Sequence, residues 1–254
     1  MRRTVLVTGG SRRIGAAIVR ALAGAGHRVV IHHHHPHDDD AVALARELDP
    51  AGERVATVAG DLSDPAAIFR AARDAMNGTV DGLVNCASVF EFDRPPAFDP
   101  ALLASLTTTN LAAPVALACK LAGQEGLANG AVVNLLDQKV ANLNPDFFSY
   151  TCTKVALEGA TMMLAQALAP RVRVNAVSPG LTLPSGDQSD AEFAAVAGEN
   201  LLRRAVPIDE LARAVEYLLT APAITGQNLF VDNGQRFLRR DGDVMFSTPG
   251  RRDG

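Results

Sequence analysis

Tyr150 and Lys154 stand four residues apart at the start of a helix-forming run, a spacing that places both side chains on one face of a helix. A phenol with an ordinary pKa of about 10 exchanges protons poorly near neutral pH. A neighbouring ammonium group favours the phenolate and lowers the pKa of the phenol toward the range of a working acid–base catalyst. The pair therefore predicts proton transfer at Tyr150, and an ordinary pair on a helix surface is the alternative interpretation.

A second chemically informative segment is the turn Thr8-Gly9-Gly10-Ser11-Arg12-Arg13-Ile14-Gly15. It lies between a short apolar run and an Ala-rich helical run at residues 16–25, which is the strand, turn and helix order of dinucleotide sites. Gly9 permits the tight turn, Gly15 permits close helix packing, and a helix N-terminus offers unpaired N–H groups to a pyrophosphate. An ordinary strand-to-helix turn is the alternative. We expect the dinucleotide to contact Gly9, Ser11, Arg12, Arg13, Ile14 and Gly15.

The charges near this turn favour NADPH over NADH. An NAD site usually has a carboxylate about 20 residues beyond the turn to bind the ribose 2′-hydroxyl, but that strand end carries the imidazoles of His33, His34 and His35. Arg12 and Arg13 add fixed positive charge, and arginine pairs with phosphate through a planar fork. The acids at residues 38–40 weigh slightly against this prediction, since a longer strand end would bring one of them near the ribose.

Histidine and cysteine usage does not predict a metal site. Five of the six histidines lie within residues 32–37, and a solvated loop is as good an interpretation of this cluster as a functional one. Neither a partner carboxylate nor a cysteine spacing supports a dedicated metal site. The three cysteines, Cys86, Cys119 and Cys152, are odd in number and widely spaced, which favours a reducing compartment over a disulfide framework.

The elements that must position these groups are short Val/Ile/Leu runs that alternate with longer Ala/Leu-rich runs of helical spacing. The short runs are continuously apolar, as burial of both sheet faces requires, so we expect parallel strands with right-handed crossovers. The predicted fold class is α/β, a Rossmann-like doubly wound parallel sheet of about seven strands with helices on both faces. The expected strands are residues 4–8, 28–31, 54–58, 82–85, 131–136, 172–177 and 228–231.

Length and composition favour a single domain. The 254 residues carry no Pro/Gly/Ser linker before residue 238, so we expect a catalytic domain at residues 1–238, with a substrate loop at about 181–203, and a polar tail at residues 239–254. Apolar residues make up 48% of the chain, and the formal charge is −4, which argues against disorder and against nucleic-acid binding. Because no uninterrupted apolar run approaches about 18 residues, we expect no membrane partner and a cytoplasmic protein with a small-molecule substrate.

Several motifs, in order, make residues 3–238 similar to the short-chain dehydrogenase/reductase family. Beyond the glycine turn and the Tyr150/Lys154 pair, the matching segments are Gly60-Asp61-Leu62, Asn85-Cys86-Ala87-Ser88, Asn110, Pro179-Gly180 and Val231-Asp232-Asn233-Gly234. The resemblance implies homotetramers that assemble through the helical runs at residues 114–122 and 155–169. It also implies further NADPH contacts at Asp61, Leu62, Asn85, Ala87, Ser88, Tyr150, Lys154, Pro179, Gly180 and Thr182.

Two departures from the common family pattern resemble the pteridine reductases. Arg13 stands where most members have glycine, and Asp137, thirteen residues before Tyr150, stands where most have the catalytic serine. Residues 31–34 resemble the His-x-His segment of those enzymes, whereas His35-Pro36 departs from their Arg-Ser. The resemblance implies a pterin held against the nicotinamide and contacted by Ser88, Phe90, Asp137 and Tyr150.

The same resemblance implies a catalytic set of Asn110, Asp137, Tyr150 and Lys154. Lys154 would hold the nicotinamide ribose, Tyr150 would give or relay the proton, and Asn110 would order a water that reconnects Lys154 to solvent. An acid at position 137 suits the nitrogen of a C=N bond better than a ketone, and an aspartate that only caps or positions a neighbour is the alternative. We therefore expect an NADPH-dependent reductase of a pteridine-type substrate, with two alternatives: a carbonyl or 3-oxoacyl reductase of the same family, and a non-catalytic NADPH-binding module.

Overall fold

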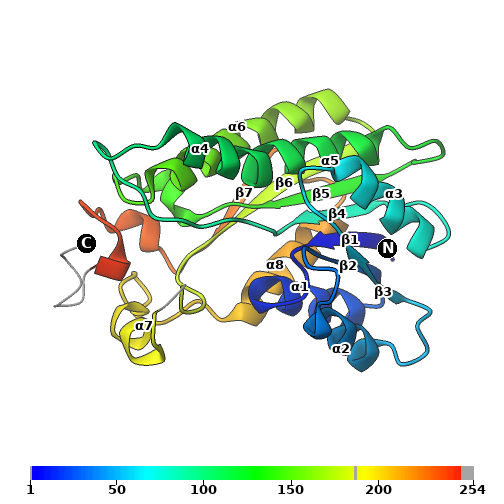
Figure 1. Cartoon of the computed structure of the whole chain (residues 1–254), viewed down its shortest axis with the longest axis horizontal. Coiled ribbons are helices and arrows are strands. Elements are labelled where there is room, and N and C mark those ends of the chain that lie inside the picture. The colour runs from blue at the N-terminus through cyan, green and yellow to red at the C-terminus, as the bar shows by residue number, and fades with distance from the viewer. Residues whose placement is uncertain (1, 186–187, 247–254) are drawn as a thin grey trace.

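The computed structural model describes residues 2–185 and 188–246, and within them the chain forms one seven-stranded sheet of order β3-β2-β1-β4-β5-β6-β7 (Figure 1). All neighbouring strands are parallel, as predicted. The strand order reverses between β1 and β4, which is the switch point where open α/β sheets bind their ligands. The strands are β1 Thr4–Thr8, β2 Arg28–His33, β3 Val55–Ala59, β4 Gly82–Asn85, β5 Gly130–Leu135, β6 Val172–Pro179 and β7 Asn228–Val231.

Helices cover both faces of this sheet (Figure 1). In one core cluster α1, α2 and α8 pack on the sheet, and in the other cluster α3, α5 and α6 do. Four short helical turns, η1 Thr108–Ala112, η2 Gln138–Ala141, η3 Gln235–Phe237 and η4 Val244–Phe246, lie between or after the main helices of the described chain. The main helices are α1 Arg13–Gly24, α2 Asp39–Leu48, α3 Pro65–Ala75, α4 Pro100–Thr107, α5 Ala113–Ala122, α6 Phe148–Leu168, α7 Asp190–Val196 and α8 Ile208–Thr220.

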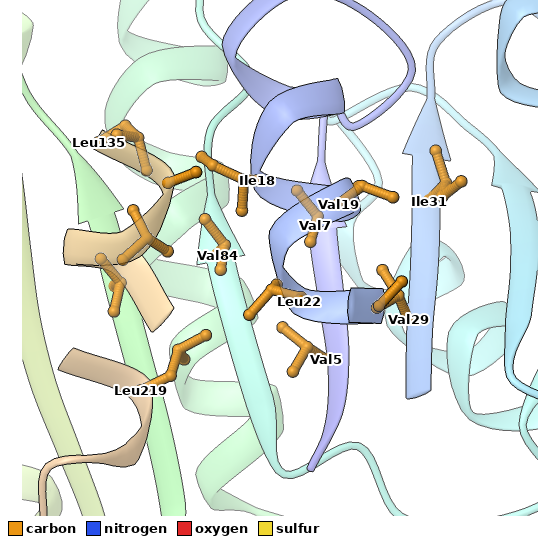
Figure 2. Packing of buried hydrophobic residues seen from close by; sticks show 14 of the residues in the cluster. Val5, Val7, Ile18, Val19, Leu22, Val29, Ile31, Val84, Leu135 and Leu219 are labelled. Carbon is orange, nitrogen blue, oxygen red and sulfur yellow. The ribbon is translucent and has the colours of Figure 1, made fainter. Parts of the chain in front are cut away.

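The first strand shows why continuous apolar runs form this sheet. Successive side chains of a strand point to opposite faces, so Val5 and Val7 enter one core cluster and Leu6 enters the other. Figure 2 shows Val5 and Val7 beside Leu22 of α1. Full burial of such a side chain contributes about 1.5–3 kcal/mol. This packing fixes β1 and α1, and therefore the glycine turn that joins them.

Several element boundaries differ from the prediction. β2 extends to His33, two residues beyond the predicted end, so His32 and His33 lie in the sheet and are buried. Polar side chains are accommodated there because both ring nitrogens of His32 have partners: Nδ1 accepts from the Gly9 amide, and Nε2 lies 3.1 Å from the Gly60 carbonyl oxygen. The predicted strand end at residue 31 was therefore too early, and the solvated-loop interpretation does not hold for these two residues. β3 is shifted by one residue, and α1 begins at Arg13 rather than residue 16.

One run within the described chain, Pro100–Ala122, is long and apolar enough to cross a membrane by length and composition alone. It comprises α4, η1 and α5. Helices of a protein core meet the same criterion, and here Leu117 and Leu121 of α5 are buried in a core cluster with α3. The apolar character of this run therefore contributes to the packing of the fold.

The two segments expected to be irregular both approach the ligand edge of the sheet. Part of the predicted substrate loop, residues 190–196, forms α7, which contacts η4. Residues 239–246 of the predicted tail turn back toward α7 (Figure 1), and Val244 is buried. The rest of the predicted tail, residues 247–254, lies outside the described residues.

Candidate active site

A cavity of about 450 Å³ lies where β1, β4, β5 and β6 end. This volume is within the usual range for small-molecule sites, about 300–1,000 Å³. Its lining includes fourteen of the residues predicted as site residues: Gly9, Arg12, Arg13, Ile14, Gly15, Ala87, Ser88, Phe90, Asp137, Tyr150, Lys154, Pro179, Gly180 and Thr182. The predicted site residues outside this lining are Ser11, His33, His34, His35, Asp61, Leu62, Asn85 and Asn110.

The glycine turn between β1 and α1 is shaped for close backbone approach. Gly9 has φ +62°, and a Cβ atom there would lie 2.9 Å from the Cα of Ala87. A Cβ atom on Gly15 would lie 2.0 Å from the carbonyl oxygen of Gly9, so neither glycine can be replaced without moving the backbone. The first turn of α1 has no acidic residue and no side-chain cap. Its free N–H groups and positive dipole end therefore suit the pyrophosphate of a dinucleotide.

The two arginines of the turn have different environments. Arg13 has φ +53°, a left-handed conformation that favours glycine, and its guanidinium donates to the carbonyl oxygen of Pro184. The Arg12 side chain is 60% exposed and pairs with the carboxylates of Asp38 and Asp40. The acids at residues 38–40 therefore do reach the glycine turn, and they hold one of its arginines.

The adenine-side residues predicted from the sequence divide into exposed and structural groups. His34 is 60% exposed and lies 3.8 Å from the Asp61 carboxylate. The Nδ1 atom of His33 lies 2.8 Å from the carbonyl oxygen of His35. The side chain of Leu62 packs in a core cluster, and Asn85 donates to the Asn134 side chain, so these two side chains support the fold.

At the other end of the cavity, Tyr150 and Asp137 are hydrogen-bonded. The Tyr150 hydroxyl in the first turn of α6 donates to Asp137 Oδ2 at 3.0 Å. Asp137 follows β5 in an extended conformation, and its Oδ1 accepts from the Lys139 amide at 2.8 Å, which caps η2. The carboxylate therefore caps a helical turn and binds the phenol at the same time.

Burial dominates the electrostatics of this pair. It raises the pKa of Asp137 above the usual carboxyl range, although the Lys139 amide and ammonium oppose the shift. Burial, followed by the Asp137 charge, raises the pKa of Tyr150 well above 10, which is opposite to the direction expected from Lys154 alone. Tyr150 is therefore a neutral phenol that carries a proton, held beside a carboxyl group with an elevated pKa.

Lys154 and Asn110 lie deeper in the protein. Lys154 Nζ donates to the Leu135 carbonyl oxygen at 2.8 Å and lies 5.6 Å from the centre of the Tyr150 ring. Burial lowers the pKa of Lys154 to about 8. Asn110 lies in η1, where its Oδ1 accepts from the Val89 amide and its Nδ2 donates to the Val89 carbonyl oxygen. Asn110 therefore anchors the loop that carries Ser88 and Phe90.

The structure also places in the cavity residues that sequence reasoning missed. Lys139, Asp243, Val244 and Met245 line it beside Asp137. No motif marks them, because Lys139 and Asp243 are 104 residues apart and the latter lies in a polar segment. Phe147 was also missed: its ring stacks on Phe90 at 4.1 Å. Among the described residues, no group of three or more His, Cys, Asp or Glu side chains could hold a metal ion.

Comparison with known proteins gives a consistent assignment. Residues 9–236 match the family described as Enoyl-(Acyl carrier protein) reductase. The chain is 35% identical to Carbonyl reductase family member 4 of Danio rerio, over 94% of this chain and 100% of that protein. It is 28% identical to the Dihydromonapterin reductase of Enterobacter sp. (strain 638), over 92% and 96% of the two chains.

Among solved structures, FolM Alternative dihydrofolate reductase 1 from Brucella suis in complex with NADP superposes with a TM-score of 0.89. It is 42% identical, over 94% of this chain and 96% of that chain. The glycine turn, the Tyr150/Lys154 pair and the seven-stranded parallel sheet all fit this match. The chain belongs to the short-chain dehydrogenase/reductase family of oxidoreductases.

Proposed function

We propose that this chain is an NADPH-dependent reductase of a pteridine-type C=N bond. The observation that carries the proposal is the hydrogen bond between Tyr150 and Asp137 in the wall of the cavity. The similar protein from Brucella suis is named as a dihydrofolate reductase and was crystallised with NADP, and the Enterobacter relative is named for a dihydropterin. Both names describe substrates with a pteridine ring.

The residues of the cavity fit NADPH. The free N–H groups of α1 and the turn at Gly9 would hold the pyrophosphate, and Arg13 would pair with the 2′-phosphate. Arg12 would add a second guanidinium once it exchanges its Asp40 partner for phosphate. Lys154 would hold the ribose hydroxyls next to the nicotinamide. When bound, the cofactor supplies a hydride to the carbon of the C=N bond.

The proton for the nitrogen comes from the hydrogen-bonded pair. Tyr150 is the donor, because its raised pKa keeps it protonated and its hydroxyl lies in the cavity wall. Asp137 has an elevated pKa, so it exchanges a proton with Tyr150 at a lower cost than an exposed carboxylate would. A fully ionised carboxylate at this position would repel the alkoxide that a ketone forms. The pair therefore favours an imine nitrogen as the proton acceptor.

A flat heteroaromatic substrate also suits the aromatic wall of the cavity. The Phe90 ring is stacked on Phe147 and edge-on to Tyr150, with ring centres 4.7 Å apart in the latter pair. A pterin ring would extend or replace this aromatic stack, and such contacts add about 0.5–1.5 kcal/mol beyond area burial. Ser88 lies in the same wall and offers a hydroxyl to the substrate.

The second candidate is a carbonyl or 3-oxoacyl reductase of the same family. The 35% identity to Carbonyl reductase family member 4 favours it. Asp137 opposes it, because that position would place a carboxyl group where a carbonyl oxygen gains negative charge. A non-catalytic NADPH-binding module is disfavoured, since Tyr150 and Lys154 both line the cavity beside the glycine turn.

The deciding experiment follows NADPH oxidation with a panel of substrates. Dihydrobiopterin, dihydromonapterin and dihydrofolate represent the proposed class, and diketones and an acetoacetyl thioester represent the alternative. We expect the highest kcat/KM with a dihydropterin, and a clear preference for NADPH over NADH. Efficient turnover of a ketone together with no turnover of any dihydropterin would replace the proposal with the carbonyl reductase.

We also propose a cytoplasmic homotetramer. The reducing compartment follows from the three widely spaced cysteines, all of which are free. The long helix α6 presents exposed apolar side chains, with Met162 50% and Met163 64% exposed. Burial of such side chains between subunits would stabilise an assembly through this helix. Sedimentation velocity at several protein concentrations tests the oligomeric state.

A further inference from the structure

A buried ammonium group lies directly behind the catalytic pair. Lys139 is 3% exposed, and its Nζ donates to the backbone carbonyl oxygen of Asp146 at 2.8 Å and to Asp243 Oδ2 at 3.0 Å. A buried charge that loses its partner is strongly destabilising, because the solvation lost on burial is no longer offset. The proposed chemistry makes no use of Lys139, so its retention in the cavity wall needs another reason.

Asp243 joins this ammonium to the C-terminal segment 243–246. Its Oδ1 accepts from the amide of Met245, and its own amide donates to the Asp146 carboxylate at 2.7 Å. The carboxylate thus has a partner at each oxygen, and one partner is in η4 itself. The contact to Lys139 therefore holds the start of η4 against η2.

The residues that follow Asp243 form a wall of the cavity. Val244 is buried, and both Val244 and Met245 line the cavity. Met245 packs in the cluster that contains Tyr150 and Phe147. The ring of Phe246 lies 6.1 Å from that of Phe147 and is nearly parallel to it. The C-terminal segment therefore closes the side of the cavity that holds the aromatic rings, away from the glycine turn.

The ion pair also lies close to the proton donor. The Lys139 amide donates to Asp137 Oδ1, so one residue contacts both carboxylates. Several titratable groups affect Asp137: Tyr150 and Lys154 from α6, Lys139 from η2 and Asp243 from the C-terminal segment, while Cys86 after β4 affects Lys154. The charge of Lys139 lowers the pKa of Asp137, and the charge of Asp243 raises it.

We propose that the Lys139–Asp243 ion pair holds the C-terminal segment 243–246 as the substrate-side wall of the cavity and balances the charge beside Asp137. Both are positioning residues, and the segment they hold determines which substrates fit. This inference rests on the proposed function for the identity of the substrate. The pairing of η2 with the C-terminal segment is independent of that identity.

The charge balance gives the two single variants opposite signatures. Lys139→Met removes the positive charge and leaves Asp243, so the pKa of the proton-donating pair rises and activity persists to higher pH. Asp243→Asn removes the negative charge, so the alkaline limb of kcat/KM moves to lower pH. We expect shifts of about 0.5 to 1 pH unit in each direction. In the double variant the two shifts cancel.

The position of the segment 243–246 gives a second expected effect, a higher KM, which should also appear in the double variant. Loss of the charge-assisted hydrogen bond should raise KM for the dihydropterin by about 10-fold in both single variants and in the double variant. The change in kcat at each pH optimum should stay below about 3-fold, since the donor itself is intact. The dissociation constant of NADPH should change less than about 2-fold, because the glycine turn lies at the other end of the cavity. Asp209→Asn, which breaks an exposed ion pair of the same length on α8, is the matched control and should change none of these quantities.

A readout without substrate separates this inference from the proposed function. Arg239 is exposed and lies four residues before Asp243, where the segment begins, so trypsin cleavage there reports release of the wall. We expect cleavage at least about 5-fold faster in Lys139→Met than in the unmodified chain or in Asp209→Asn, since proteolysis follows the population of the open form. If the chain reduces a ketone and no dihydropterin, the proposed function fails, and the pH and KM measurements are made with the ketone.

The fold of each variant is checked by its thermal transition and by NADPH binding. Should Lys139→Met not fold, Asp243→Asn and Val244→Ala carry the test: the first should move the pH limb and KM, and the second only KM. If both single variants shift the alkaline limb of kcat/KM in the same direction, the proposed charge balance between Lys139 and Asp243 is wrong. If folded Asp243→Asn shows an unchanged KM and an unchanged rate of trypsin cleavage, the ion pair does not hold the segment 243–246 as a wall of the cavity.

Discussion

Arg13 links backbone strain with cofactor recognition, and two replacements separate these effects. Its φ of +53° places a long side chain in the left-handed region, which favours glycine. Arg13 lines the cavity, where its guanidinium donates to the Pro184 carbonyl oxygen, and the proposed function assigns it to the 2′-phosphate. Arg13→Gly removes both the strain and the charge, whereas Arg13→Ala removes the charge and keeps the strain.

The magnitudes follow from the conformation and the contact. A non-glycine residue in the left-handed region destabilises the folded state by about 1–2 kcal/mol. Replacement by glycine removes this strain, but the greater flexibility of glycine in the unfolded chain reduces the gain in folding stability by about 0.4–1 kcal/mol. Arg13→Gly should therefore be more stable than Arg13→Ala by about 1 kcal/mol, or about 2–4 °C in Tm for a domain of this size. A charged hydrogen bond to phosphate is worth about 1.5–3 kcal/mol, so both variants should bind NADPH at least about 10-fold more weakly.

The assay combines thermal unfolding without cofactor and titration with NADPH and NADH. The affinity for NADH should stay nearly unchanged in both variants, because it has no 2′-phosphate. Equal Tm values for Arg13→Gly and Arg13→Ala would refute the strain argument. Equal losses of NADPH and NADH affinity would show that Arg13 shapes the turn and does not recognise the phosphate, and equal kcat/KM for the two cofactors in the unmodified chain would refute the preference itself.

Three further predictions concern the other polar groups of the site. Tyr150→Phe should lower turnover by about 10² to 10⁴-fold and leave NADPH affinity unchanged; more than half of the activity remaining would show that Tyr150 is not the donor. Asp137→Ser should lose dihydropterin reduction and keep activity on activated ketones, as measured with both substrates across pH. Burial lowers the pKa of His32 in the folded protein to about 4, from an ordinary 6.5. As pH falls, His32 is therefore protonated in the unfolded chain before it is protonated in the folded protein. The contribution of His32 to the free energy of unfolding should be complete above about pH 6.5, and the free energy of unfolding should fall by about 3 kcal/mol toward pH 4. Urea unfolding should show this loss in the unmodified chain and in His37→Gln, but a smaller one in His32→Gln.

The sheet was predictable because its signals are local. Runs such as residues 4–8 are apolar at nearly every position, and burial of both faces explains that pattern. The Tyr150/Lys154 pair was equally accessible, since helical spacing alone brings the two side chains together. The end of β2 was not, because a run of histidines resembles a solvated loop until the partners of His32 at Gly9 and Gly60 are known.

The electrostatics of the site depended on contacts between distant segments. The spacing of Tyr150 and Lys154 predicted a lowered pKa for the phenol, but burial and the Asp137 carboxylate after β5 reverse the direction. The residues Asp243 to Met245 were interpreted as part of a polar tail that begins at residue 239. They enter the cavity because Lys139, 104 residues earlier, pairs with Asp243, and no periodicity in the sequence encodes that distance.

An aspartate at position 137 can do what a serine there cannot. A carboxylate has two oxygens: Oδ2 accepts a hydrogen bond from the Tyr150 hydroxyl while Oδ1 caps η2 through the Lys139 amide. Lys139 in turn contacts Asp243, so a continuous chain of contacts runs from the phenol to the C-terminal segment. A serine hydroxyl has one oxygen and no charge, so it would bind the phenol or the amide with less effect on either. An aspartate at this position therefore couples the proton donor to the residues that form the substrate wall.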